Sequence, residues 1–305
     1  MLIHQMAPWV PTFIQACKNN SQPFVPFQLA TVDKINGNKP RCRTVVFRDF
    51  LFKDKNSNIL TFNTDIRSDK IKESILCDEL SGSTDFEACF YFHQTWEQFR
   101  FSGDCFILSQ NELNRLPQEI IKKYGILSPK MCGHNLDELY KYDTNDEPNE
   151  NGDENENESE NYFEDNDVMI DSTEVLSDNS INTNGEIMVL EENPYATNKD
   201  WNLEIKRQWS LLSRSTRSQY RKPQPGEPIT TETSKKLDKI QRGVDGTKEN
   251  AGLENFAVVC LCIEEVDYLN LKGPSGAERW KYKRQIEKEY DGQYCFVWEE
   301  KEVCP

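Results

Sequence analysis

The chain has 305 residues, of which 36% are hydrophobic, and its formal net charge is −16 at pH 7. Most of this charge lies in residues 142–198, which contain no Lys or Arg but 18 Asp and Glu and 12 Asn. The remaining residues carry 36 basic and 34 acidic side chains and enough apolar mass for a real core. No basic stretch is interleaved with aromatic residues, and the overall charge repels phosphate backbones, so we do not expect a nucleic-acid binder.

The apolar stretches and the cysteines indicate the compartment. The longest apolar run, residues 256–263, has eight residues, whereas a bilayer span needs about 20, so we expect no transmembrane helix. The start of the sequence lacks the basic residues and long apolar run of a secretory signal. Ten Cys at uneven gaps, without a CxxC pair, indicate free thiols and a cytoplasmic or nuclear location. Three scattered His predict no metal site.

The first part of the chain predicts one helix and then a sheet. Apolar residues at helical spacing predict a short helix over residues 8–20. Turn signals then separate runs of β-branched and aromatic residues. These runs predict strands at residues 27–33, 41–52, 59–64, 86–93 and 99–108. Five strands at this spacing indicate a meandering antiparallel sheet that closes into a barrel.

The rest of the chain predicts further helices and a second set of strands. Helices are expected over residues 65–76, 111–124 and 201–220, and strands over residues 256–265, 268–271, 280–284 and 294–298. Because strands flank the acidic region on both sides, we predict one barrel with an insert looped out of it. Its parts are residues 1–135, the insert 136–199, and residues 200–305, with a polar linker at 230–250.

The insert is too polar to bury, so we expect a disordered, low-complexity segment. Two interpretations of it stay open: a solvated spacer, or a docking segment for a basic protein partner.

Two clusters of basic residues suggest a phosphate ligand. Arg43 and Arg48 lie at the two ends of one predicted strand, and arginine binds phosphate with two parallel hydrogen bonds. Five residues apart, they point to opposite faces unless a bulge or strong twist intervenes. Residues 63–70 place hydroxyls, backbone amides and two cations at a junction between a strand and a helix, which attracts anions.

The order of several motifs is more specific than each motif alone. The segments 27–32, 43–48, 61–70, 97–103 and 279–284 together resemble the pyridoxamine 5'-phosphate oxidase-like FMN-binding split-barrel family. Trp209, Arg217 and Tyr220, followed by a Pro-x-Pro-Gly motif, resemble its branch of short flavin-binding proteins rather than the vitamin B6 oxidases. The resemblance implies a mainly β fold with flanking helices, a six-stranded antiparallel split barrel. It also implies a homodimer with FMN at the interface.

The resemblance also assigns residues to the cofactor. Arg43, Thr44 and Val45 would hold the ribityl phosphate and the flavin edge, and Arg48 would stand at a basic phosphate position. The other positions implied to bind FMN are Asn63, Thr64, Ser68, Lys70, Gln98 beside the flavin ring, and Arg279, which closes over it.

The sequence departs from the family at several of these positions. Asp69 stands where the family usually has a second phosphate-binding arginine, and only Arg67 could compensate for the missing positive charge. Leu269 replaces an aromatic residue. The Arg-x-His element that binds the ring of the B6 substrate is absent. Beyond Arg217, no residue is identifiable that would bind the phosphate of that substrate. We therefore predict FMN binding and nominate no catalytic acid or base.

Three functions follow from this interpretation. The first is an FMN-dependent oxidoreductase acting on an unknown small molecule. The second is a pyridoxamine or pyridoxine 5'-phosphate oxidase with an altered substrate pocket. The third is a non-catalytic FMN-binding scaffold.

Overall fold

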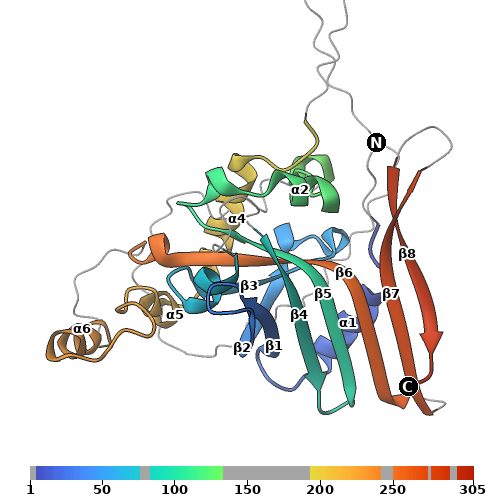
Figure 1. Ribbon diagram of the computed structural model, residues 1–305, viewed down its shortest axis with the longest axis horizontal. Coiled ribbons are helices and arrows are strands. Elements are labelled where there is room, and N and C mark those ends of the chain that lie inside the picture. The colour runs from blue at the N-terminus through green and yellow to red at the C-terminus, as the bar shows by residue number, and fades with distance from the viewer. Residues whose placement is uncertain (1–4, 76–82, 133–192, 242–249, 274–275, 289–293) are drawn as a thin grey trace, which may run out of the picture.

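The computed structural model describes residues 5–75, 83–132, 193–241, 250–273, 276–288 and 294–305. One helix precedes eight strands, and short helices lie between them (Figure 1). The first helix is α1 (Trp9–Lys18), and the strands are β1 (Val25–Asp33), β2 (Lys39–Phe50), β3 (Ile59–Asp65), β4 (Ser83–Phe92), β5 (Glu97–Leu108), β6 (Phe256–Gly273), β7 (Gly276–Lys288) and β8 (Tyr294–Val303).

Strands β1 to β6 form the predicted barrel. The order in the sheet is β3-β2-β1-β4-β5-β6-β7-β8, all neighbours are antiparallel, and β3 also pairs with β6. This additional pairing closes six strands into a ring and confirms the six-stranded antiparallel barrel. The second half of β6 leaves the ring and pairs with β7, to which β8 adds as an edge strand (Figure 1). The two strands predicted within residues 256–271 are therefore one long strand.

A bulge marks the point where β6 leaves the barrel. The register between β5 and β6 shifts between Ser102 and Gly103, where Ser102 pairs with Glu265 and Gly103 with Ile263. Gly103 has a φ of +154°, and a Cβ atom there would lie 2.1 Å from the carbonyl oxygen of Cys262. Only glycine allows the two backbones to approach this closely.

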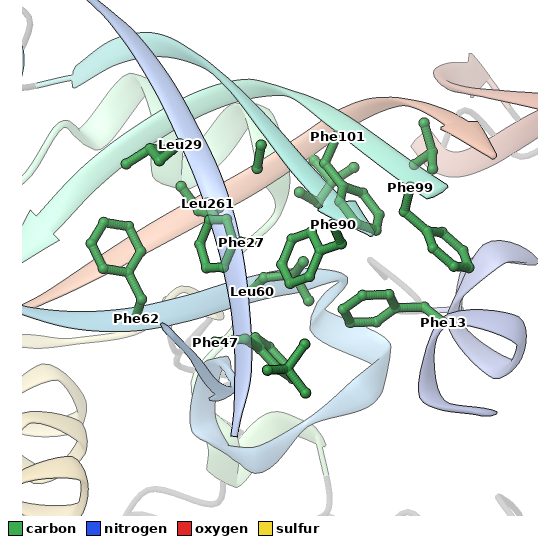
Figure 2. Packing of buried hydrophobic residues seen from close by; sticks show 14 of the residues in the cluster. Phe13, Phe27, Leu29, Phe47, Leu60, Phe62, Phe90, Phe99, Phe101 and Leu261 are labelled. Atoms are coloured by element: carbon green, nitrogen blue, oxygen red, sulfur yellow. The ribbon is translucent and has the colours of Figure 1, made fainter. Parts of the chain in front are cut away.

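Aromatic rings fill the barrel, and α1 covers one of its openings. Phe13 of α1 is fully buried among four rings of the three strands β2, β4 and β5, with centroid distances of 5.1 to 5.5 Å and edge-to-face geometry. Figure 2 shows this packing, with Phe47, Phe90, Phe99 and Phe101 around Phe13. The alternation of apolar residues along the strands produces this core because every second side chain points inward.

A second apolar cluster covers the outer face of β6, under helices α2 (Gln118–Tyr124) and α4 (Asn198–Ser210). The predicted helix 201–220 is two helices: α4 ends at Ser210, and Ser213 caps α5 (Arg214–Gln219) by accepting a hydrogen bond from the Thr216 amide with its hydroxyl. Pro117 interrupts the predicted helix 111–124, which leaves a short turn (Leu113–Arg115) and α2.

Two further sequence predictions differ from the structure. Within the predicted helix 65–76, the described helical part is residues 69–75, which end in a π turn (Ile71–Ile75). Residues 65–68 form a turn instead, because Asp65 accepts a hydrogen bond from the backbone amide of Arg67. The predicted linker 230–250 contains helix α6 (Thr231–Gln241). Among the described helices, none has the length and apolar character needed to cross a membrane.

Most of the predicted insert, residues 133–192, lies outside the described residues. Its predicted final residues belong to the fold: Tyr195 forms a β-bridge with Leu127, and Thr197 and Asp200 form a capping box at the start of α4. The division of the chain into three segments stays a prediction. The eight cysteines whose side chains the structure describes are free thiols, as expected: Cys17, Cys42, Cys89, Cys105, Cys132, Cys260, Cys262 and Cys304.

The end of the β1–β2 hairpin is held by an inward-facing carboxylate. Asp33 accepts hydrogen bonds from the Asn36 backbone amide and from Arg41 Nη2, at 2.8 Å each. Burial raises the pKa of Asp33, but these hydrogen bonds outweigh it and lower the pKa to about 2. Arg41 also lies 3.6 Å from Glu73, whose carbonyl oxygen accepts a hydrogen bond from the Lys34 amide. The hairpin is thus tied to the turn that follows β3.

Replacement of Gly103 by Ala should destabilise the barrel by about 1–3 kcal/mol more than replacement of Gly37 by Ala. Both glycines have positive φ, but a Cβ at Gly37 meets nothing within 4 Å, so Gly37→Ala reports the backbone strain alone. Denaturant unfolding of the two variants measures the difference. Equal losses would mean that the close approach of Gly103 to Cys262 adds nothing.

The stabilising contribution of Asp33 should depend on pH. Its pKa is lower in the folded state than the usual value of about 3.9, so this contribution is complete above about pH 5 and is lost as the pH falls toward 2. Unfolding of the wild type and of Asp33→Asn from pH 7 to 2.5 should show a difference that shrinks with acid. Asp85→Asn, which changes an exposed carboxylate, is the control. A difference that is constant over this range would contradict the assignment.

Candidate functional site

Lys70 gathers two hydroxyls at the end of β3. Its Nζ donates to Thr64 Oγ1 at 2.8 Å and to Ser68 Oγ at 3.0 Å. Thr64 is the penultimate residue of β3, and Ser68 lies in the turn that follows, where its amide donates to the Asp65 carbonyl. Both hydroxyl residues are buried. The turn therefore brings one cation and two hydroxyl groups to a single point.

The charge of a second cation, Arg43, acts on Lys70. Arg43 Nη1 donates to Thr31 Oγ1 at 2.7 Å and to the Leu29 carbonyl at 3.3 Å, which holds the guanidinium over β1. Burial lowers the pKa of Lys70, and the nearby positive charge of Arg43 lowers it further. Burial also lowers the pKa of Arg43.

Within the ranges that the structure describes, neither Arg43 nor Lys70 forms an ion pair with a carboxylate. We call Arg43, Thr64, Ser68 and Lys70 the anion hook. Lys70 is half-buried near the charge of Arg43 and beside two hydroxyls, and a bound anion would offset both the repulsion and the desolvation. The charges of Asp65 and Asp69 on Lys70, and of Glu73 on Arg43, offset them in part.

The bulge that the sequence required for Arg48 is present, but it does not bring the two arginines together. Phe47 pairs with Phe62 and Asp49 with Thr61, so Arg48 is the extra residue of β2. The charge of Arg48 acts on Tyr220, whose pKa is raised by burial and lowered by this arginine. Tyr220 packs on the outer face of β6, whereas Arg43 pairs with the inward-facing Leu29. The two arginines therefore serve opposite faces of the sheet.

The other predicted residues of β2 and β3 divide between the same two faces. Thr44 is exposed, and the half-buried Val45 packs against the core inside the barrel. Asn63 precedes Thr64 and therefore points to the opposite face of β3. Its Oδ1 is buried and, among the described residues, has no hydrogen-bond partner. A buried acceptor without a partner costs about 1–3 kcal/mol, and a donor from a ligand or water would remove this cost.

Gln98 and Arg279 lie together on the outer face of the sheet, away from the anion hook. Gln98 pairs with Leu269, and Leu269 pairs with Arg279, so the three form one row across β5, β6 and β7. The hook residue Thr64 pairs with Ala257, twelve residues before Leu269 on β6. This separation is about 40 Å along a strand, so one chain does not unite Arg279 with the hook.

Two arginines that the sequence left as candidates have structural roles. Arg67 binds the Asp65 carboxylate and donates to the carbonyls of Tyr220 and Lys222, so it does not replace the hook arginine missing at Asp69. Arg217 donates to the carbonyls of Trp209 and Ser210 at the end of α4. It satisfies terminal carbonyls of that helix.

The sequence reasoning missed two partners of the site. Thr31 holds Arg43, and Asp267 forms two hydrogen bonds with Arg279. Strand alternation and antiparallel pairing of the predicted strands 268–271 and 280–284 would place Asp267 and Arg279 on one face, which is the signal that could have found this pair.

Three comparisons describe what the chain is similar to. Residues 6–109 match the family model of the pyridoxamine 5'-phosphate oxidase FMN-binding domain. An uncharacterized protein of Saccharomyces cerevisiae is 52% identical over 311 residues, which cover 99% of each chain. The pyridoxine/pyridoxamine 5'-phosphate oxidase 2 of Arabidopsis thaliana is 42% identical over 102 residues, which cover 32% of this chain and 45% of the plant protein.

A solved structure shares the fold. It is a pyridoxamine 5'-phosphate oxidase-related, FMN-binding protein of Nostoc punctiforme, with 21% identity and a TM-score of 0.54, and the match covers 99% of this chain and 100% of that one. Its barrel architecture agrees with the closure of β1 to β6, and the family model covers the strands that supply the anion hook. The chain belongs to the pyridoxamine 5'-phosphate oxidase-like family of FMN-binding split barrels.

Proposed function

We propose that this protein binds FMN and moves electrons or hydride between a small molecule and an acceptor. The observation that carries the proposal is the anion hook, in which Lys70 gathers the Thr64 and Ser68 hydroxyls near the charge of Arg43, and neither cation forms an ion pair among the described residues. A phosphate monoester fits such a group because it accepts several charged hydrogen bonds, each worth about 1.5–3 kcal/mol.

The residues present fit the cofactor in one further respect. Gln98 and Arg279 supply donors on an open face of the sheet. Bound flavin supplies the redox chemistry, and the protein supplies position, charge and access. The hook residues hold the phosphate end, whereas Gln98 and Arg279 contact the ring.

The separation of the two sets of residues supports a homodimer in which both protomers contact each FMN. The hook and Arg279 pair with opposite ends of β6, about 40 Å apart along the strand. One protomer would therefore supply the hook, and its partner would supply Arg279.

A B6 vitamer oxidase with an altered pocket is the second candidate, and the similarity to the Arabidopsis thaliana oxidase over 102 residues favours it. The structure gives it little further support. The residues before Arg279, where the oxidases bind the ring of the B6 substrate, are Gly276, Ala277 and Glu278. Arg217 donates to the carbonyls at the end of α4. Hydrogen peroxide formed from pyridoxamine or pyridoxine 5'-phosphate and oxygen would support this candidate over the first.

The visible spectrum of the purified protein tests cofactor binding. We expect a yellow protein that releases about one FMN per protomer on heating. A colourless protein that takes up no added FMN would refute the proposal. A yellow protein that neither oxidises a substrate nor is reduced by NAD(P)H would leave a non-catalytic FMN-binding scaffold.

Replacement of Lys70 by Met should weaken FMN binding roughly 10- to 100-fold, since it removes one charged hydrogen bond of about 1.5–3 kcal/mol. Titration of the flavin-free protein, followed by the quenching of flavin fluorescence, measures the dissociation constant. Lys72→Met is the matched control, because Lys72 is exposed and two residues away. Equal effects of the two substitutions would show that Lys70 contributes only to the overall charge.

A further inference from the structure

Four charged residues of alternating sign cross the outer face of the sheet, one on each of the strands β4 to β7. Arg100 Nη2 lies 2.6 Å from Glu87, and Arg100 Nη1 lies 3.9 Å from Asp267. Asp267 in turn accepts two hydrogen bonds from Arg279, at 2.9 Å from Nε and 2.8 Å from Nη2. Arg279 is therefore the last residue of a row that starts at Glu87.

This pairing fixes the direction of the guanidinium and leaves part of it available. A guanidinium has five N–H donors in one plane, and Asp267 takes one from Nε and one from Nη2. Both donors of Nη1 and the second donor of Nη2 remain. Arg279 is 32% exposed and lines an open groove of about 470 Å³ on this face, together with Arg100 and Lys281.

The charge around Arg279 differs from that of the anion hook. The Arg279 hydrogen bonds lower the pKa of Asp267, which keeps this carboxylate ionised at neutral pH and offsets the charge of the arginine. Arg43 and Lys70, in contrast, have no such partner among the described residues. A compensated arginine attracts a phosphate weakly, but it still donates strong, directed hydrogen bonds to a neutral acceptor.

We propose that Asp267 is a positioning residue that holds Arg279 so that its remaining N–H donors meet a neutral acceptor on the flavin ring. This inference rests on the proposed FMN binding and deepens it. The two sites bind different parts of the cofactor: the anion hook binds the phosphate, and Arg279, held by Asp267, binds the ring.

Two flavins and two carboxylates provide the test. FMN and riboflavin have the same ring, but riboflavin lacks the phosphate. Asp267→Asn keeps the shape of the side chain and removes its charge. Glu265→Gln is the matched control, because Glu265 lies on the same strand and pairs with Lys283 at 2.7 Å, and both of these side chains are more than half exposed. The dissociation constants of both flavins are measured for the full-length, flavin-free proteins.

Asp267→Asn should weaken the binding of FMN and of riboflavin by the same factor, about 5- to 20-fold. Without Asp267, the guanidinium of Arg279 must be ordered when the flavin binds. Glu265→Gln should change neither constant. Asp267→Glu, which restores a carboxylate, should recover much of the loss. In the background of Arg279→Lys, Asp267→Asn should reduce the affinity for both flavins little further, because the guanidinium that Asp267 positions is absent. Lys70→Met should weaken the binding of FMN and leave the binding of riboflavin unchanged.

Several results would overturn the inference. Asp267→Asn with wild-type affinity for both flavins would show that Arg279 needs no positioning, and a loss for FMN alone would place Arg279 at the phosphate. Riboflavin binding too weak to measure in the wild type would assign the binding energy to the phosphate. A loss that Asp267→Glu does not reduce, with a lower unfolding temperature of the flavin-free variant, would make Asp267 structural. Wild-type protein that binds no FMN would instead refute the proposed function.

Discussion

The pairing of β3 with β6 is the contact on which the rest of the structure depends. It joins Asn63 to Val258 and Thr64 to Ala257, residues that lie far apart in the chain. The pairing closes the ring, buries the outer face of β6 under α4, and holds the turn that carries Ser68 and Lys70 at the rim of the barrel. Without closure, β3 would be an edge strand, and the anion hook would have no rigid support.

The same strand explains why the site is divided. Beyond the bulge opposite Gly103, β6 leaves the ring and carries Asp267 and Leu269 into the extension with β7 and β8. The part of β6 in the ring therefore supports the anion hook, and the part in the extension supports Arg279. This long strand keeps the two sets of cations apart within one protomer, and the proposed homodimer would unite them.

The arginines of this protein show that residue type alone does not define a role. Arg67 and Arg217 donate hydrogen bonds to backbone carbonyls. Arg207 is buried between Glu204 and Asp49, and it links α4 to β2. Arg43, in contrast, binds a hydroxyl and carbonyls, and within the described part of the chain it forms no ion pair. An arginine whose donors are already filled by fixed acceptors has little left for a ligand, whereas one that faces another cation without a carboxylate favours an anion.

Much of the fold could be predicted from the sequence, because alternation of apolar residues and turn signals are local properties of the chain. The positions of the strands, α1 and a closed antiparallel barrel follow from them, whereas the number of six strands in the barrel was implied only by the family resemblance. The order of motifs likewise identified the family, and the positions that it implies for FMN include the four residues of the anion hook. The interruption at Pro117 is also a local signal, but helical periodicity concealed it, as it concealed the cap at Ser213.

Only the tertiary structure decided which of these residues meet. The bulge at Arg48 arises from the register between β2 and β3, and the local sequence contains no record of that register. The partners of Arg43, Arg67 and Arg279 lie on other strands or loops, so their charges are free or compensated according to long-range pairing. Sequence therefore determined which chemical groups are available and how they alternate along each strand. Packing decided where each group lies and which charges face one another, because these depend on contacts between distant segments of the chain.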